Sequence, residues 1–342
     1  MSAPVMTLAV FNERARWSLP EGLVDRLRDA AGDRAQIRAA TTRAQLLEQL
    51  PGTDYLVGFP LTDEQFAQHG GELRWIQLTG SGGDLTPTLI GAMDRGVRIT
   101  SAASIRAPQV AEHAMALLLT LFRRLDLTMR AQTEHRWAST DVAPQIRNLS
   151  GATVGLIAVG CIGQEIAQRL KAFGVTVVAT RRDPSNPYMY VDQVVPTERI
   201  NDLMEMCDAI IVATPRIPAT DDLIGARQFK VMRPGMVLID VGRGGVVNQN
   251  AMLDALRRGR LAAAGLDVFA TEPLPPASPL WTMPNVIVTP HISAASPHYW
   301  EHAVEVIATN LNRMLSGEPM IDEITHEWLD QLKPRKSEAA SR

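Results

Sequence analysis

Short apolar runs alternate with amphipathic helical stretches along nearly the whole chain. Apolar residues at helical spacing lie between the first three of the N-terminal runs, over residues 21–31 and 43–50. The N-terminal runs themselves occupy residues 7–11, 35–40, 55–59, 73–79 and 97–102. Because parallel strands need a crossover connection, usually a helix, this alternation predicts a parallel sheet covered by helices.

A second series of apolar runs follows a long, almost uniformly apolar helix predicted over residues 107–125. Its members are rich in Val and Ile and nearly continuous, as expected for strands that are covered on both faces. They occupy residues 153–159, 175–180, 209–214, 236–241, 262–268 and 285–290. The pattern predicts an α/β fold of two doubly wound parallel-sheet domains. We expect the first domain over 1–104 and 296–335, the second over 105–295, and a flexible tail over 336–342.

Composition narrows the class of protein. The chain has 342 residues, 46% of them hydrophobic and 21% charged, with a net charge of -3. These values are ordinary for a folded protein and give nucleic-acid binding no electrostatic support. Only Cys161 and Cys207 occur, and the longest apolar stretch, 114–122, is too short to span a bilayer. We therefore expect a cytoplasmic protein without nucleic-acid or membrane partners.

A glycine loop follows the first strand of the second series. Residues 158–163 read A-V-G-C-I-G, a G-x-G-x-x-G dinucleotide motif in which Ala158 replaces the first glycine. Gly160 would allow close approach of a pyrophosphate, and Gly163 would allow close packing of helix on strand. Ala158 suits the turn at negative φ and costs about 1 kcal/mol or more at positive φ. Alone, the segment also fits an ordinary strand-to-helix turn. As a cofactor loop it would contribute Ala158, Gly160, Cys161, Ile162 and Gly163.

The next predicted strand bears on the choice of cofactor. An acidic residue about 20 positions after the motif's start typically binds the ribose hydroxyl of NAD. Here the strand ends in Arg181 and Arg182, with Asp183 just beyond. Two guanidiniums suit the 2′-phosphate of NADP, because their forked donors match phosphate oxygens. The alternative is a solvated surface pair beside Asp183. The sequence favours NADP(H), with NAD(H) possible.

Charged side chains follow three consecutive strands near the end of the second series. Arg243 lies in a glycine-rich turn, Asp267 and Glu272 follow the next strand, and His291 follows the last. Ligands of open α/β sheets bind at the carboxyl ends of the strands. Each residue alone could be an ordinary surface or strand-end residue, but together they predict a catalytic constellation.

These segments closely resemble the D-isomer-specific 2-hydroxyacid dehydrogenase family, in its glyoxylate and hydroxypyruvate reductase branch. The resemblance covers nearly the whole chain and rests most strongly on "RPGMVLIDVGRGGVVN", "GLDVFATEPLP" and "TPHIS", in that order. It implies a flavodoxin-like substrate domain, a Rossmann cofactor domain and an active site in the cleft between them. It further implies an NAD(P)-dependent oxidoreductase for 2-keto or D-2-hydroxy acids, and a homodimer.

The resemblance also implies residue roles. Arg243 would clamp the substrate carboxylate, His291 would exchange a proton with the C2 oxygen, and Glu272 would bind the other imidazole nitrogen. Asp267 would lie near the nicotinamide carboxamide. Backbone N–H groups of Ser81 and Gly82 would bind the substrate carboxylate. The remaining cofactor-binding residues expected from the family pattern are Thr214, Pro215, Val241, Gly242 and Ser293.

The chain departs from the family pattern near the first domain crossover. Ser101 stands where the family often has Asn, and Ala103-Ser104 where Pro-Gly is common. Arg106 is a candidate substrate-binding residue, or it could equally be paired within the protein.

Two alternative interpretations compete with dehydrogenase function. Residues 298–302 fit H-x-x-E-H, a zinc-protease motif, but a polar helix face explains them better and we expect no metal. A non-enzymatic, NAD(H)-binding corepressor-like regulator of the same fold is the alternative function.

Overall fold

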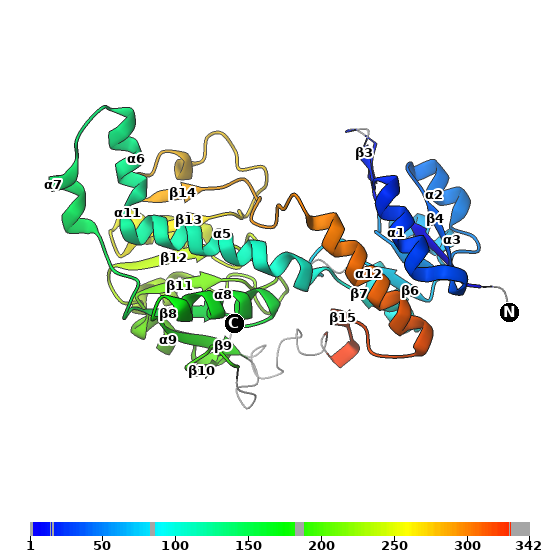
Figure 1. Cartoon of the computed structure of the whole chain (residues 1–342). Coiled ribbons are helices and arrows are strands. Elements are labelled where there is room, and N and C mark those ends of the chain that lie inside the picture. The colour runs from blue at the N-terminus through cyan, green and yellow to red at the C-terminus, as the bar shows by residue number, and fades with distance from the viewer. Residues whose placement is uncertain are drawn as a thin grey trace. The chain divides into compact units, whose positions relative to one another are not determined.

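The computed structural model describes residues 3–13, 15, 17–82, 86–181, 188–327 and 329. The chain divides into two compact units, which are considered separately (Figure 1). The first contains Met1–Arg106 and Ser296–Leu332, and the second contains Ala107–Ala295. The predicted tail over 336–342 and the candidate cofactor residue Arg182 lie outside the described residues.

The first unit is built on a six-stranded sheet with the order β15-β7-β6-β5-β1-β4. All neighbours are parallel except β15, which is antiparallel to β7. In chain order the five parallel strands run 2-1-3-4-5, the flavodoxin-like arrangement. The strands are β1 (Val5–Leu8), β4 (Gln36–Ala39), β5 (Tyr55–Val57), β6 (Trp75–Gln77), β7 (Arg98–Thr100) and β15 (Glu323–Ile324). A small hairpin pairs β2 (Phe11–Asn12) with β3 (Trp17–Ser18).

Helices cover both faces of this sheet, as its apolar composition requires. Val24 and Leu27 of α1 (Glu21–Ala31) pack with Leu311 of α12 (Tyr299–Ser316) in one core cluster. The other cluster receives buried side chains from three helices, for example Phe66. These helices are α2 (Arg43–Gln49), α3 (Asp63–His69) and α4 (Pro87–Asp94). The strands between them are therefore buried on both sides, which explains their unbroken apolar runs.

The second unit is built on a seven-stranded, fully parallel sheet with the order β10-β9-β8-β11-β12-β13-β14. In chain order this is 3-2-1-4-5-6-7, which contains the Rossmann strand order. The order reverses between β8 and β11, and this is where such sheets bind dinucleotides. The strands are β8 (Thr153–Ile157), β9 (Thr176–Arg181), β10 (Gln193–Pro196), β11 (Ala209–Val212), β12 (Met236–Asp240), β13 (Leu261–Leu266) and β14 (Val286–Val288).

Two groups of helices enclose the Rossmann sheet. Leu118 of α5 (Ala103–Arg123) and Ile166 of α8 (Cys161–Ala172) belong to the core cluster on one face. The cluster on the other face is filled from α9 (Ile200–Met206), α10 (Ala226–Val231) and α11 (Gln249–Arg257). The remaining helices are α6 (Leu125–Thr133), α7 (Ser139–Val142) and short 3₁₀ turns at Gly32–Arg34, Ala143–Gln145, Thr197–Arg199 and Pro279–Trp281. The predicted fold class, flavodoxin-like followed by Rossmann, is confirmed.

The long helix α5 begins at Ala103, four residues before the predicted start at 107, and it contains Pro108. Its first turn is held by Asp322, whose carboxylate accepts hydrogen bonds from the Ser104 backbone N–H and hydroxyl, at 2.8 and 2.6 Å. A carboxylate is favourable at a helix N-terminus, so this distant residue extends the helix beyond the proline. In the described ranges, no helix combines the length and apolarity that a membrane span requires.

Candidate active site

The three charged segments predicted from the sequence lie after adjacent strands of the Rossmann sheet. Arg243 follows β12, Asp267 and Glu272 follow β13, and His291 follows β14. Since β12, β13 and β14 are neighbouring and parallel, their carboxyl ends share one edge of the sheet. The second unit thus gathers these side chains at the edge where α/β proteins bind ligands.

His291 and Glu272 form a direct side-chain pair. The imidazole Nδ1 lies 2.6 Å from Glu272 Oε2, and Glu272 Oε1 accepts a hydrogen bond of 2.9 Å from the Phe269 N–H. An ionised carboxylate can only accept, so the pair requires the hydrogen to be on Nδ1. This leaves Nε2 as the ring nitrogen that can exchange a proton. The His291 side chain is 44% exposed, so the ring is accessible.

His291 has a left-handed backbone, with φ 54°. This region is uncommon for a residue with a side chain and is tolerated where the surroundings fix it. Here Asp267 supplies the restraint, because its carbonyl accepts the His291 N–H at 3.0 Å. Its carboxylate accepts the next two N–H groups, from Ile292 at 3.0 Å and Ser293 at 2.9 Å.

Asp267 is itself fully buried and also accepts the Thr289 hydroxyl at 2.6 Å. The His113 Nε2 on α5 lies 2.9 Å from the same hydroxyl. A buried carboxylate with this many donors is well satisfied and holds its partners in place. Asp267 therefore positions the loop that carries His291. The sequence offered no signal for this role, since it depends on the backbone conformation of His291.

The Arg243 turn packs directly on the chain that leads to Glu272. Arg243 Nη1 donates to the Gly242 carbonyl at 2.9 Å, and the Gly242 N–H donates to Asp240 Oδ1 at 3.1 Å. A Cβ atom on Gly244 would lie 1.7 Å from the Phe269 carbonyl oxygen. Only glycine permits this approach, so the two turns contact each other through their main chains.

The glycine loop performs the three motif functions unequally. A Cβ on Gly163 would lie 2.7 Å from the Ala158 carbonyl oxygen, so close helix packing requires this glycine. A Cβ on Gly160 would meet no protein atom within 4 Å, which fits a residue kept small for a ligand. Ala158 has φ 72°, so its backbone is in the left-handed region and not at the negative φ that would suit an alanine. Its N–H donates to the Thr180 hydroxyl at 3.1 Å, which helps to hold the strained turn.

The surroundings of this loop fit a dinucleotide. Cys161 and Ile162 begin α8, and the loop lies at the carboxyl end of β8, beside the point where the strand order reverses. The backbone N–H groups and the dipole at a helix start favour an anionic pyrophosphate. Thr214 and Gly242 are neighbours after β11 and β12, since a Cβ on Gly242 would lie 2.7 Å from the Thr214 carbonyl oxygen. Pro215 and Val241 adjoin them in the sequence, and Ser293 lies in the loop held by Asp267.

Arg181, at the end of β9, has an unsatisfied donor. Its Nη1 is buried and has no hydrogen-bond partner among the described residues. The guanidinium carbon lies 4.7 Å from the centre of the Tyr188 ring, a cation–π contact. Burial raises the pKa of Tyr188, so its hydroxyl stays neutral beside the arginine. A buried guanidinium nitrogen without a partner is costly, and an anionic ligand oxygen would satisfy it.

The first unit contains Arg106, Ser81 and Gly82, three of the residues predicted to contact substrate. Arg106 donates to the Thr79 carbonyl through Nε at 3.1 Å and Nη2 at 2.9 Å, and the Tyr299 hydroxyl donates to the same oxygen at 2.8 Å. The guanidinium carbon of Arg106 also lies 4.5 Å from the centre of the Tyr299 ring. Ser81 and Gly82 follow in the same loop, after Gly80. Arg106 is thus engaged within its own unit, and Tyr299 is a contributor that the sequence did not reveal.

The H-x-x-E-H segment over 298–302 begins α12. Tyr299, between its two histidines, is buried in the core of the first unit. Across the part of the chain that the structure describes, no group of three or more His, Cys, Asp or Glu side chains could hold a metal ion.

Comparison with known proteins matches this architecture to one family. The family model described as "D-isomer specific 2-hydroxyacid dehydrogenase, NAD binding domain" matches residues 115–293. The chain belongs to the D-isomer specific 2-hydroxyacid dehydrogenase family. The matched region contains the glycine loop and the Arg243, Glu272 and His291 segments, so the sheet edge described above lies in the family's cofactor domain.

Individual relatives extend the likeness over most of the chain. D-3-phosphoglycerate dehydrogenase of Mycobacterium tuberculosis is 32% identical over 89% of this chain and 59% of its own length. The chain thus spans little more than half the length of such relatives. Human glyoxylate reductase/hydroxypyruvate reductase is 37% identical over 67% of this chain and 70% of its own length. A Xanthobacter autotrophicus D-isomer specific 2-hydroxyacid dehydrogenase, solved with NADPH and MES, is 26% identical with a TM-score of 0.80, covering 96% and 99% of the two chains.

Proposed function

We propose that the protein is a nicotinamide-dependent 2-keto acid reductase, acting equally as a D-2-hydroxy acid dehydrogenase in reverse. The observation that carries this proposal is the His291–Glu272 pair at the carboxyl edge of a Rossmann sheet, on a loop that Asp267 holds in a strained conformation. Strain at a solvent-accessible acid/base residue is typical of functional sites. A human relative named glyoxylate reductase/hydroxypyruvate reductase is consistent with this substrate class.

The chain's own residues supply proton transfer and charge. When bound, the reduced cofactor supplies a hydride to C2 of the keto acid, while one proton must reach the C2 oxygen. His291 donates that proton from Nε2, and Glu272 stabilises the imidazolium through Nδ1 at 2.6 Å. After donation the imidazole ring is neutral. Its Nδ1 keeps its hydrogen, which is still donated to Glu272. In the oxidative direction the same nitrogen accepts the proton.

Binding of the substrate carboxylate is assigned to Arg243 and to the loop of Ser81 and Gly82. A guanidinium matches a carboxylate through two parallel hydrogen bonds. We propose that Arg106 acts on the substrate indirectly, by fixing the Thr79 carbonyl and hence the backbone of the following loop. Asp267 holds the loop of His291 and Ser293 through its carboxylate, which fits its expected place beside the nicotinamide.

NADP(H) is the proposed cofactor. The support is the buried Arg181 Nη1 without a hydrogen-bond partner among the described residues, which a 2′-phosphate oxygen would satisfy. Arg182, the second arginine of the hypothesis, stays a sequence-based prediction. A relative at 26% identity was solved with NADPH.

Homodimerisation is proposed through the segment of α6 and α7. In Figure 1, α7 stands away from the seven-stranded sheet of its unit. Residues of the segment line an open hollow of about 690 Å³. Trp137 in this lining is 91% exposed, and Met129 on α6 is 64% exposed. Large exposed apolar side chains of this kind mark interaction surfaces. Trp137→Asp should reduce the mass measured by light scattering from dimer to monomer, and a wild-type monomer at micromolar concentration would refute the proposal.

A cytoplasmic location is also proposed. Neither Cys161 nor Cys207 forms a disulfide, and Cys207 is buried in the core. Cysteines that form no disulfide fit a reducing compartment. Fractionation of the native host followed by immunodetection would test the assignment.

The activity is tested with a panel of 2-keto acids and each reduced cofactor. We expect cofactor oxidation with glyoxylate, hydroxypyruvate or a related acid, faster with NADPH than with NADH. Cofactor binding without turnover of any 2-keto acid would instead favour the corepressor-like regulator. No observation in the described part of the structure supports that alternative.

A further inference from the structure

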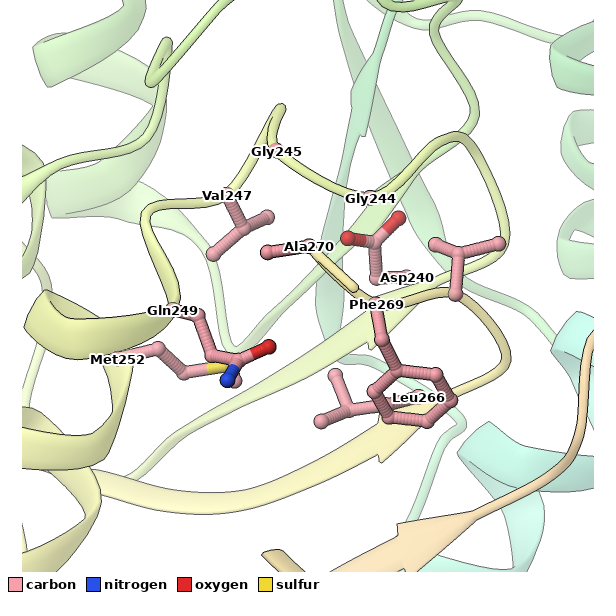
Figure 2. Close-up of a pocket in the computed structure, with 10 residues that line it drawn as sticks. Asp240, Gly244, Gly245, Val247, Gln249, Met252, Leu266, Phe269 and Ala270 are labelled. Atoms are coloured by element: carbon pink, nitrogen blue, oxygen red, sulfur yellow. The ribbon is translucent and has the colours of Figure 1, made fainter. Parts of the chain in front are cut away.

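The turn that carries Arg243 contacts two neighbouring segments. Its Gly244 packs on the main chain at Phe269, and Figure 2 shows Gly244 and Gly245 in succession along the turn, with Phe269 on the segment that it contacts. The second contact comes from the loop over residues 216–224, which follows β11. Because β11 and β12 are neighbouring parallel strands, this loop and the turn leave the sheet at the same edge.

Main-chain hydrogen bonds join the loop to the turn. The Asp222 N–H donates to the Gly245 carbonyl at 2.8 Å. The Ile224 N–H donates to the Val246 carbonyl at 3.1 Å, and the Asn248 N–H donates back to the Ile224 carbonyl at 2.9 Å. The loop therefore helps to set the position of the backbone of the turn.

One side chain of the loop also reaches the turn, at Gly245. This glycine has φ 96°. A Cβ atom on it would lie 2.7 Å from the guanidinium carbon of Arg216, 2.8 Å from its Nε and 3.0 Å from its Nη1. The guanidinium thus packs on the side of Gly245 from which a side chain would project. The contact lies two residues after Arg243 in the sequence, and only glycine combines it with the positive φ.

The guanidinium of Arg216 is fixed by Asp221. Its Nε donates to Asp221 Oδ1 at 2.6 Å, and both side chains are 49% exposed. The loop between them has hydrogen bonds of its own, since the Thr220 hydroxyl accepts the Ile217 N–H at 2.9 Å and donates to the Pro215 carbonyl at 2.7 Å. An exposed ion pair contributes little to stability, so we expect the protein to fold when either member of the pair is replaced.

We propose that Arg216 is a positioning residue, whose guanidinium packs on Gly245 and holds the Arg243 turn where it binds the substrate carboxylate. The proposal rests on the proposed role of Arg243 as the carboxylate clamp. Arg216 acts through the turn and touches neither substrate nor cofactor. Without the guanidinium the turn is less well held, so the keto acid binds less tightly. The binding of NADPH changes little, because its phosphates are assigned to the glycine loop and Arg181.

Substitutions at the pair give the kinetic test. Arg216→Ala should raise the KM for the keto acid about threefold or more, with a smaller change in kcat and an NADPH dissociation constant within about twofold of the wild type. Asp221→Ala should raise KM in the same direction. Asp221→Asn keeps the Oδ1 acceptor for Nε, so its KM should stay close to the wild-type value. Arg258→Ala, in an exposed pair with Asp254, is the matched control and should leave KM unchanged.

Two further measurements test how Arg216 acts. Arg216→Ala combined with Asp221→Ala should raise KM no more than Arg216→Ala alone, since Asp221 acts only through the guanidinium. In the ligand-free protein, Arg216→Ala should speed hydrogen exchange of the Asp222 and Ile224 amides about tenfold or more, because both N–H groups donate to the turn. The control Arg258→Ala should leave both exchange rates unchanged.

An unchanged KM in Arg216→Ala would overturn the proposal, as would unchanged exchange of the Asp222 and Ile224 amides. NADPH binding weakened as much as keto-acid binding would also overturn it, because Arg216 would then be a direct cofactor contact. If Arg243→Ala itself leaves KM unchanged, the proposed carboxylate clamp fails. The exchange rates in the ligand-free protein then still decide whether Arg216 holds the turn.

Discussion

The Nδ1 atom of His291 lies 2.6 Å from Oε2 of Glu272, although the two residues follow different strands of the Rossmann sheet. The pair depends on two supports, the Phe269 N–H on Glu272 and the carboxylate of Asp267 under the histidine loop. Because each support comes from the segment after β13, that segment organises the acid/base group.

The strained turn at Ala158 predicts a stabilising substitution. Ala158→Gly removes the penalty of φ 72° and should raise the free energy of unfolding by about 0.5–1 kcal/mol, measured by urea denaturation. Ala251→Gly, in the ordinary helix α11, is the control and should lower it by about 0.5–1 kcal/mol. A destabilised Ala158→Gly would show that the methyl group makes contacts worth more than the strain.

We expect the carboxylate of Asp267 to affect catalysis by positioning the loop of His291. Asp267→Asn keeps the side-chain volume but leaves one of the Ile292 and Ser293 N–H groups without an acceptor, which costs about 1–3 kcal/mol. We expect kcat/KM for the keto acid to fall about tenfold or more, because His291 is no longer held. Steady-state kinetics that match the wild type would contradict this role.

We expect substitution of Arg106 to weaken the binding of all substrates alike. Arg106→Leu removes two donors from the Thr79 carbonyl, and Tyr299→Phe removes the third. Both substitutions should raise KM for short acids such as glyoxylate and equally for acids with a second polar group. The increase should be larger for Arg106→Leu than for Tyr299→Phe. A loss of about 1–3 kcal/mol in kcat/KM confined to the second group would assign Arg106 to direct substrate recognition instead.

We expect Arg181 to discriminate between NADPH and NADH, which a binding measurement can test without turnover. Arg181→Gln should weaken NADPH binding at least tenfold in a fluorescence titration and leave NADH binding within about threefold, because only NADPH carries the 2′-phosphate. Arg227→Gln, on α10, is a control of equal charge change. Equal weakening of both cofactors would mean that Arg181 supports the fold rather than the phosphate.

The arrangement at the sheet edge could be predicted because it follows from the parallel direction of the strands. Parallel strands present their carboxyl ends on one edge, so Arg243, Glu272 and His291 had to gather once each was placed after a strand. The Gly163 packing was predictable for a similar local reason. Short strands such as β10 and β15 were missed, since a few residues carry too little apolar pattern.

Other features depend on tertiary contacts that leave no local signal. Tyr299 and Thr79 are separated by 220 positions, yet the hydroxyl of one binds the carbonyl of the other. The left-handed backbones of Ala158 and His291 likewise arise from their surroundings and not from residue type. The early start of α5 depends on Asp322, which comes from the far end of the chain.

The most direct test of the account is the effect of His291→Ala on turnover and on cofactor affinity in one preparation. If His291 is the acid/base, kcat for reduction of the best 2-keto acid should fall on the order of a hundredfold or more, while the NADPH dissociation constant changes little. Glu272→Gln should give a smaller loss, since the amide still accepts from Nδ1–H but no longer stabilises the imidazolium. Near-normal turnover by His291→Ala would contradict the central claim.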